Sequence, residues 1–271
     1  MIAVTELTRV LGDGKRAKTI LDGISFVAPP GMITGLLGPN GAGKTTTMRV
    51  LSTLLRPTSG TVSIAGYDVV AQAHEVRSSI GLVTEEPGLY DRLTAREQLS
   101  FTGRACGMSA SAVGPRIDEL GHLLGCSREL DKRCGELSKG NRQKVALLRA
   151  LVHDPPVLLL DEPTANLDVV ATAAIHDLLT TLDVAAGKTV LLSSHSLDEV
   201  DRLAQRVVGL VAGRVVVDGT REEIAATDPT GSFRDAFVSL LGQATLAAGE
   251  VEAEAEGADP VATARRSKRG R

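Results

Sequence analysis

The segment Gly38–Thr45 reads GPNGAGKT and contains the residue types that a phosphate-binding loop needs. It follows an apolar run, Met32–Leu37, and fits the pattern G-x-x-x-x-G-K-[ST]. Glycines allow backbone N–H groups to converge on phosphate oxygens, and a helix beginning near Lys44 directs the positive end of its dipole at the same anion. Lys44 would reach the terminal phosphates, and the hydroxyl of Thr45 would bind Mg²⁺. We expect the nucleotide to contact Gly38, Pro39, Asn40, Gly41, Ala42, Gly43, Lys44, Thr45 and Thr46.

Two acids after another apolar run supply the partner that a phosphate loop requires. Asp161 and Glu162 stand directly after Val157–Leu160. Asp161 is expected to bind Mg²⁺, directly or through a water molecule, and Glu162 to act as the general base that polarises the attacking water. Acids after a strand can also cap helices or turns. The nearby phosphate loop favours the catalytic interpretation, because the chemistry at that loop needs such acids.

Further segments resemble the motifs of the ABC ATPases, in the order that this family keeps them. LSKGN, Leu137–Asn141, is similar to the family signature LSGGQ. LLLDEPTANLD, Leu158–Asp168, looks like the second nucleotide motif with the adjoining dimer loop. His195, within SSHSLDEVDRLAQRV, stands where the family keeps its switch histidine. Ile80–Leu99 resembles the segment that leads into the helical subdomain. The resemblance extends from the amino terminus to about residue 240.

The resemblance implies that two copies of the chain close head to tail around two ATP molecules. Ser138 and Gly140 would begin a helix whose N-terminal N–H groups face the γ-phosphate of ATP on the other copy. Asp168 would help the two sites to communicate. His195 is expected to contact the γ-phosphate and to form the catalytic set with Glu162 and Lys44. Taken alone, LSKGN would be an ordinary cap before a basic helix, and His195 a partly buried structural histidine.

Four positions depart from the family pattern. Leu11 stands where an aromatic side chain usually stacks on adenine, and leucine offers apolar contact without a π-face. Lys139 replaces a signature glycine, and Asn141 replaces a glutamine. Glu85 replaces a loop glutamine that normally contacts Mg²⁺ or the attacking water. We predict that Glu85 is a metal ligand, because a carboxylate binds hard cations strongly. The alternative is that Glu85 faces solvent, as loop acids usually do.

The elements that must position these residues alternate between buried strands and helices. Apolar runs predict strands at Met32–Leu37, Ile80–Val83, Val157–Leu160 and Thr189–Leu192. Helical patterns separate them at Lys44–Leu54, Leu137–Val152 and Val169–Leu182. Arg214–Gly219 closes a late hairpin or edge strand, and Gly12–Lys18 is a polar turn between two early strands. The sequence therefore predicts an α/β fold: a P-loop NTPase core with an inserted helical subdomain.

We predict one ABC ATP-binding domain over residues 1–242, with the helical subdomain at about 86–150, where no convincing strand is found. Residues 243–271 are predicted to be a disordered charged tail. Its first half is rich in Ala and Glu, and its end, Arg265–Arg271, is basic. Low hydrophobicity and segregated charge are typical of such tails.

The composition narrows the possible partners. The 271 residues are 43% hydrophobic and carry a net charge of −3, so no basic field favours a specific nucleic acid. Three cysteines without CxxC spacing indicate neither a disulfide framework nor a zinc site. No apolar run approaches the ~20 residues that span a bilayer. A role at a membrane would therefore require another chain to cross it.

These observations predict an ATP-binding and ATP-hydrolysing subunit of an ABC-type membrane transporter. Within the family, the sequence looks most like ABC-2-type exporters, including sodium-efflux and drug-resistance systems. The chain would be cytoplasmic, lie on the inner face of the cell membrane and energise a separate transmembrane permease. Two alternatives stay open: a soluble ABC-class ATPase acting on ribosomes, DNA or cofactor assembly, and a regulatory ATP-binding module without turnover.

Overall fold

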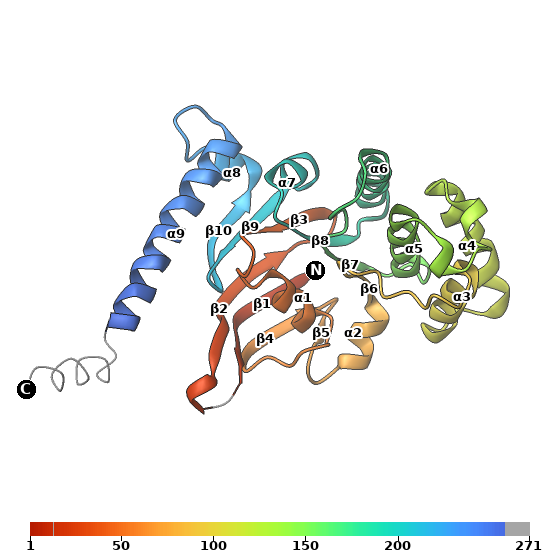
Figure 1. The fold of residues 1–271 in the computed structure, drawn as a ribbon, viewed down its shortest axis with the longest axis horizontal. Coiled ribbons are helices and arrows are strands. Elements are labelled where there is room, and N and C mark those ends of the chain that lie inside the picture. Colours follow the sequence, from red (N-terminus) through yellow and green to blue (C-terminus); the bar gives the residue numbers. More distant parts are fainter. Residues whose placement is uncertain (13, 258–271) are drawn as a thin grey trace, which may run out of the picture.

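The structure, a computed structural model, describes residues 1–12 and 14–257 and contains two sheets (Figure 1). The six-stranded sheet has the order β10-β9-β3-β8-β7-β6. Its strands are β3 (Met32–Leu37), β6 (Ile80–Val83), β7 (Val157–Asp161), β8 (Thr189–Ser194), β9 (Arg206–Val211) and β10 (Arg214–Thr220). All neighbours in it pair parallel except β10, which pairs antiparallel with β9 at the edge. The predicted strands and the late hairpin are thereby confirmed.

The four-stranded sheet is antiparallel and has the order β2-β1-β4-β5. It consists of β1 (Ile2–Leu11), β2 (Lys18–Ala28), β4 (Ser59–Ile64) and β5 (Tyr67–Asp68). A short 3₁₀ turn at Gly14–Arg16 joins β1 to β2, where the sequence predicts a polar turn.

Helices flank the larger sheet and form a separate lobe. They are α1 (Lys44–Leu51), α2 (Ala73–Ser79), α3 (Ala95–Ala105), α4 (Ala110–Leu123), α5 (Lys139–Leu151), α6 (Val169–Ala186), α7 (Leu197–Leu203), α8 (Arg221–Ala225) and α9 (Phe233–Gly257). The lobe contains α3, α4 and α5 and lies at one end of the molecule (Figure 1). Between β6 and β7, every described element of regular secondary structure is a helix, as the sequence predicts for this segment.

Two apolar clusters cover the two faces of the large sheet. Successive residues of a strand point to opposite faces, and β7 follows this rule. Leu159 packs with Met48 of α1 and Phe26 of the small sheet. Leu158 and Leu160 belong to the other cluster, which includes α5, α6, α7 and α9. Because both faces of the sheet are buried, its strands are continuous apolar runs. Because neighbouring strands are parallel, the carboxyl ends of β3, β6, β7, β8 and β9 meet at one edge of the sheet.

The structure places helix where the sequence predicts the first part of a disordered tail, after residue 242. α9 continues without a break from Phe233 to Gly257. Ala and Glu are strong helix formers, so this composition also extends a helix that is already anchored. The anchor is apolar: Phe233, Ala236 and Phe237 are buried against the core. Residues 258–271, with the basic stretch, lie outside the described residues.

Candidate active site

The phosphate loop joins the end of β3 at Leu37 to the start of α1 at Lys44. At two of its glycine positions, Gly38 and Gly43, no residue with a side chain would fit. A Cβ on Gly38 would lie 2.1 Å from the carbonyl oxygen of Leu210, a contact that no real side chain makes. Gly43 has a φ of 109°, and a Cβ there would lie 2.6 Å from Leu21. The loop can therefore stay close to β2 and β9 while its backbone faces the cavity.

The ammonium group of Lys44 lies between the phosphate loop and Glu162. Its Nζ donates to the carbonyl oxygen of Gly38 over 2.8 Å and to that of Pro39 over 3.3 Å. It also lies 3.7 Å from Oε1 of Glu162, and both side chains are largely buried. A cation at the end of a phosphate loop is placed to neutralise phosphate oxygens. The structure therefore places the Lys44 ammonium at the phosphate loop beside Glu162, and its contact with phosphate stays a prediction.

Asp161 ends β7 and lies behind the phosphate loop, 4% exposed. The hydroxyl of Ser193, on the adjacent β8, donates to Oδ1 of Asp161 over 2.5 Å. Thr45 Oγ1 lies 3.5 Å from the same oxygen. The two proposed Mg²⁺ ligands are thus neighbours and both present oxygen. A hydroxyl and a carboxylate fit Mg²⁺, which takes few protein ligands when phosphates and water supply the rest.

Glu162 and His195 form a pair at the carboxyl ends of β7 and β8. Nδ1 of His195 lies 2.8 Å from Oε2 of Glu162. Glu162 has a φ of 50°, in the left-handed region that few non-glycine residues adopt. Its backbone N–H donates to the carbonyl and hydroxyl oxygens of Ser193, which hold this turn in place. Such strain concentrates at functional sites, and here it turns the carboxylate toward the cavity.

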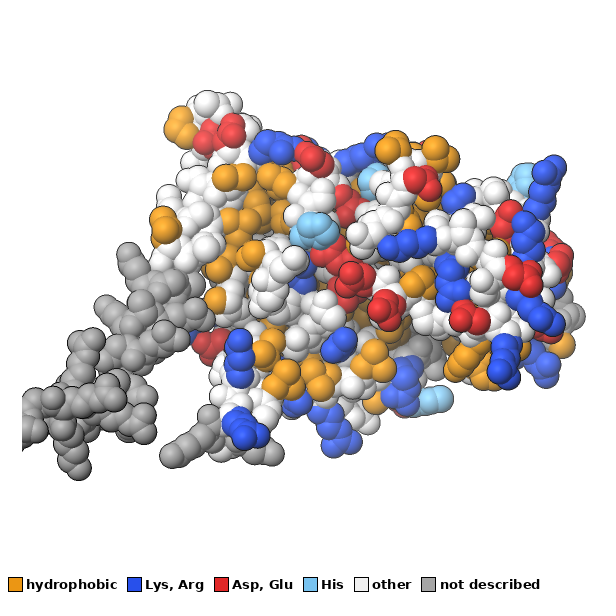
Figure 2. Space-filling view, viewed as in Figure 1, with side chains coloured by type: hydrophobic (Ala, Val, Ile, Leu, Met, Phe, Trp, Pro, Cys, Tyr) orange, Lys and Arg blue, Asp and Glu red, His pale blue; other side chains and the backbone are white. Residues whose placement is uncertain are grey.

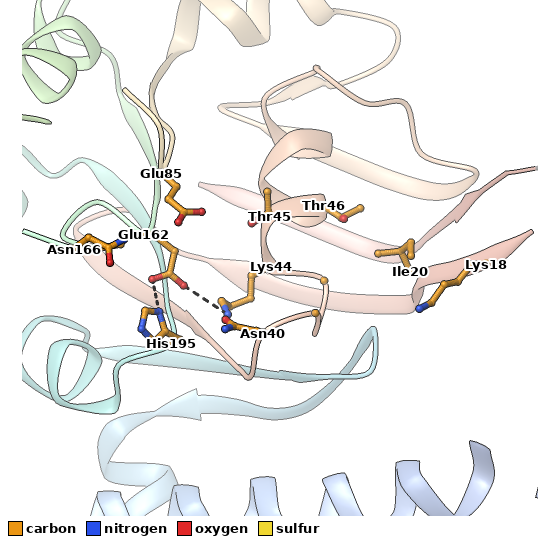
Figure 3. A pocket seen from close by; sticks show the side chains of 13 residues that line it. Lys18, Ile20, Asn40, Lys44, Thr45, Thr46, Glu85, Glu162, Asn166 and His195 are labelled. Carbon is orange, nitrogen blue, oxygen red and sulfur yellow. Dashed lines mark hydrogen bonds and ion pairs between the residues drawn. The ribbon is translucent and has the colours of Figure 1, made fainter. Parts of the chain in front are cut away.

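These residues surround a cavity of about 570 Å³, within the range of small-molecule sites (Figure 3). Of the predicted residues, it is lined by Asn40, Gly41, Gly43, Lys44, Thr45, Thr46, Glu85, Glu162 and His195. Sequence reasoning missed four lining residues: Lys18, Ile20, Ala165 and Asn166. On the face drawn in Figure 2, acidic side chains gather at its middle beside a histidine, while Lys and Arg are spread among acids. The cavity therefore combines a cationic loop with acids opposite it.

Leu11 is not brought to this cavity. β2, rather than β1, lies beside the phosphate loop, because Gly43 packs against Leu21 and the carbonyl oxygen of Ile20. Leu11 pairs with Lys18 across the hairpin, is 39% exposed and is absent from the lining. Lys18 and Ile20 occupy the end of the cavity away from Glu162 (Figure 3). The aliphatic side chain at this end of the cavity is therefore Ile20, and not Leu11.

Glu85 lines the cavity, and its carboxylate points toward Thr45 and Glu162 (Figure 3). The side chain is also exposed to solvent. The place of Glu85 in the cavity lining agrees with a metal-site role, and its exposure agrees with the alternative that it faces solvent. Ligation of a metal by Glu85 remains a prediction.

The variant Glu85→Gln is expected to raise the Mg²⁺ concentration for half-maximal ATP turnover by about 3-fold or more, because a neutral amide is a weaker ligand for a hard cation. Titration of ATPase activity with Mg²⁺ measures this effect. Glu86→Gln is the matched control, since Glu86 is exposed and does not line the cavity. Superimposed titration curves for wild type and Glu85→Gln would contradict a role of Glu85 in the metal site.

Ser138, Gly140 and Asp168 lie together outside the cavity. Ser138 caps α5, where its hydroxyl accepts from the N–H of Asn141 over 3.3 Å. Asp168 caps α6, where its Oδ1 accepts from the N–H of Ala171 over 2.8 Å. A Cβ on Gly140 would lie 3.0 Å from Ala171 Cβ and 3.8 Å from Oδ2 of Asp168. The predicted site residues of one chain therefore lie on two separate surfaces: the cavity and the adjoining ends of α5 and α6.

The fold and cavity define a P-loop nucleotide-binding protein. A family model described as "ABC transporter" matches residues 21–165, and one described as "AAA domain, putative AbiEii toxin, Type IV TA system" matches residues 133–201. The chain belongs to the ABC transporter ATP-binding family, and it binds and hydrolyses ATP. Within residues 1–12 and 14–257, no helix combines the length and the apolar character needed to cross a membrane.

Curated relatives and solved structures are similar over most of the chain. The "ABC transporter ATP-binding protein NatA" of Bacillus subtilis (strain 168) is 37% identical over 242 residues, which cover 89% of this chain and 98% of the relative. The "Daunorubicin resistance ATP-binding protein DrrA3" of Streptomyces coeruleorubidus is 41% identical, and the match covers 83% of this chain and 71% of the relative.

Among solved structures, the "Structure of ATP binding subunit of ABC transporter" has a TM-score of 0.79 and 31% identity, and covers 88% of this chain and 98% of its own. The "Dimeric structure of a post-hydrolysis state of the ATP-binding cassette MJ0796 bound to ADP and Pi" has a TM-score of 0.75 and 27% identity. This match covers 81% of this chain and 98% of the solved chain. The same cassette architecture is therefore known in a dimer that holds the products of ATP hydrolysis.

Proposed function

We propose that this chain is the ATP-hydrolysing subunit of an exporter, and that two copies close head to tail around two ATP molecules to drive a separate permease. The main support for this proposal is that the predicted site residues lie on two separate surfaces of one chain, the cavity and the adjoining ends of α5 and α6. The cavity holds Lys44, Glu162 and His195, whereas Ser138 and Gly140 lie outside it on the same chain. A second copy in head-to-tail orientation would place those helix N-termini over the γ-phosphate.

Exposed apolar side chains beside Asp168 support this self-association. Val169 is 84% exposed and Val170 is 77% exposed, at the start of α6. Large apolar residues at such exposure favour contact with another protein surface, since burial removes them from water. Their position next to Asp168 agrees with a dimer contact at this end of α6.

In the proposed reaction, each residue around the cavity has one task. Lys44 neutralises the β- and γ-phosphate oxygens, and the carboxylate of Glu162 accepts the proton of the attacking water. His195, 2.8 Å from Glu162, is placed to orient that carboxylate and to contact the γ-phosphate. Thr45 and Asp161, with Glu85 at the rim, would hold Mg²⁺, which would supply further positive charge to the phosphates.

The proposed permease partner follows from the names of the relatives, which include a daunorubicin resistance protein and a "Nod factor export ATP-binding protein I". An exporter requires a membrane-crossing path, which would place this chain on the inner face of the cell membrane. A candidate docking residue is Phe101 of α3, which is 68% exposed. It borders a groove of about 690 Å³ together with Arg96 and Arg104. An exposed aromatic side chain flanked by arginines is typical of interface centres.

Purification of the tagged chain from native membranes in mild detergent is expected to recover a multi-span membrane protein with it. Phe101→Ala should reduce that recovery by about 10-fold, because truncation of a central aromatic residue commonly costs an interface that much affinity or more. Val238→Ala, an exposed apolar position on α9, is the matched control. Exclusive recovery with ribosomes or nucleic acid would contradict the proposed permease and favour the soluble class of ABC ATPase.

A further inference from the structure

Glu199, on α7, is a buried carboxylate that joins three separate parts of the core. It is 6% exposed. The hydroxyl of Thr164 donates to its Oε1 over 2.5 Å, and the hydroxyl of Ser194 donates to its Oε2 over 2.7 Å. Nε2 of His176, on α6, lies 3.0 Å from Oε1. The loop after β7, the end of β8 and the middle of α6 therefore meet at one side chain.

The charge of this carboxylate is maintained by its partners. Burial raises the pKa of Glu199, but hydrogen bonds from His176, Thr164 and Ser194 outweigh burial, so the pKa lies below its ordinary value. An ionised acceptor makes stronger hydrogen bonds than a neutral one. Well-packed apolar residues often stabilise a core as much as a buried ionic cluster does. The cluster is therefore better explained by the geometry it imposes than by stability.

Two of the three partners adjoin the proposed catalytic pair. Thr164 follows Glu162 by two residues, and Ser194 immediately precedes His195. The segment 162–168 begins with Glu162 and ends at Asp168, the N-cap of α6. One carboxylate thus holds both the segment that carries the proposed base and the segment that carries the histidine.

Packing leaves one side of the 162–168 segment uncovered. A second cavity of about 380 Å³ is lined by Thr164 and Asn166 of this segment and by residues of α6 and α7. Asn166 has a φ of 59° and Glu162 a φ of 50°, so two of its non-glycine residues have left-handed backbone. A segment with such strain and an open side needs polar contacts to fix its position.

We propose that Glu199 is a positioning residue that keeps Glu162 and His195 paired and couples that pair to Asp168. It touches neither member of the pair and acts through Thr164 and Ser194. The inference rests on the catalytic roles proposed above for Glu162 and His195. Movement of Asp168 against a second copy would shift Thr164, and Glu199 would transmit that shift to Ser194 and hence to His195.

The test uses Glu199→Gln and Thr164→Val, singly and together, in the full chain. Glutamine keeps the size of the side chain but removes the charge, and valine keeps the shape of threonine but removes the hydroxyl. The matched controls are Glu222→Gln, an exposed position on α8, and Thr180→Val, whose hydroxyl donates only within its own helix, to the carbonyl oxygen of His176. ATP turnover is measured against ATP concentration, and amide hydrogen exchange of 162–168 and 194–198 is measured without nucleotide.

Glu199→Gln is expected to lower kcat by about 10-fold and to change KM by less than about 3-fold, since it disturbs the reacting groups and leaves the phosphate loop intact. Exchange should rise in both segments in Glu199→Gln and Thr164→Val, but in neither control. The double variant should lose little more kcat than the worse single variant, because the two residues act as one unit. A multiplicative loss of kcat, or wild-type kcat in Glu199→Gln, would overturn the proposal, as would unchanged exchange.

The exchange measurement separates this inference from the function on which it rests. If Glu162→Gln turned over ATP at the wild-type rate, the proposed base would be wrong whatever Glu199 does. If Glu162→Gln stalls but exchange in 162–168 and 194–198 is the same in Glu199→Gln and wild type, only the positioning role fails.

Discussion

Glu162→Gln is expected to bind ATP and to hydrolyse it at least about 100-fold more slowly than wild type, because general bases typically contribute 10²- to 10⁴-fold to a rate. The amide can occupy the space of the carboxylate but cannot accept a proton from water. Removal of the carboxylate also removes the negative charge that lies 3.7 Å from Lys44, so binding of the anionic nucleotide should not weaken. Turnover and ATP affinity are measured separately to check both parts.

The stalled variant is also expected to accumulate as a dimer with ATP and Mg²⁺. The proposed composite site closes on ATP and opens after hydrolysis, so a block of hydrolysis holds it closed. Size-exclusion chromatography with and without nucleotide detects the change, and Glu86→Gln serves as the control that still turns over. A variant that binds ATP yet remains a monomer under every nucleotide condition would argue against the composite site.

The strands and the phosphate site could be predicted from the sequence because their physical signals are local. β3 and β6 have the bounds that their apolar runs predict, since strands buried on both faces need continuous apolar residues. α6 runs further than predicted, to Ala186, where Gly187 adopts the left-handed conformation that ends many helices. The loop glycines, Lys44 and the acids after β7 could be found because each motif combines residue type with spacing.

The end of the cavity lined by Lys18 and Ile20 could not be predicted from the sequence. The lining there depends on which strand lies next to the phosphate loop. Gly43 packs against β2, and this contact brings β2 rather than β1 beside the phosphate loop. The two segments in contact are about twenty residues apart in sequence, so local patterns do not reveal the contact. Asn166 was missed for a similar reason: the turn that carries it is folded back by Thr164 and Glu199. The end of α9 differs from the predicted tail boundary because Ala- and Glu-rich composition is compatible with both disorder and helix.

The sequence relatives show that the chain is an ABC-family ATPase. The proposed composite site, however, depends on residues that local geometry alone would not link to catalysis. Ser138 and Asp168 each make the hydrogen bonds of an ordinary helix cap. Lys139, the first residue of α5, is exposed beside Ser138. If a second copy presents this helix end to the γ-phosphate, Lys139 would add a cation near the anion that the helix dipole already attracts.

Lys44→Ala is expected to reduce ATP turnover at saturating ATP by at least about 100-fold, since loss of one electrostatic contact to a developing negative charge commonly costs 10²- to 10³-fold. The Lys44 ammonium donates to the carbonyl oxygens of Gly38 and Pro39 at 2.8 and 3.3 Å, and alanine can make neither contact. Removal also leaves the buried carboxylate of Glu162 without its cation 3.7 Å away, which should weaken the binding of a further anion.

Lys44→Met tests whether the charge or the packing of Lys44 matters, because methionine keeps most of the aliphatic stem. Both variants are expected to lose turnover equally, with Lys44→Met closer to wild type in thermal stability. Lys132→Ala, at a side chain that is 53% exposed and paired with Glu129, is the control for loss of a lysine remote from the cavity. Turnover within about 3-fold of wild type in Lys44→Met would show that the cation does not act on the phosphates, and the phosphate-loop assignment of Lys44 would then be wrong.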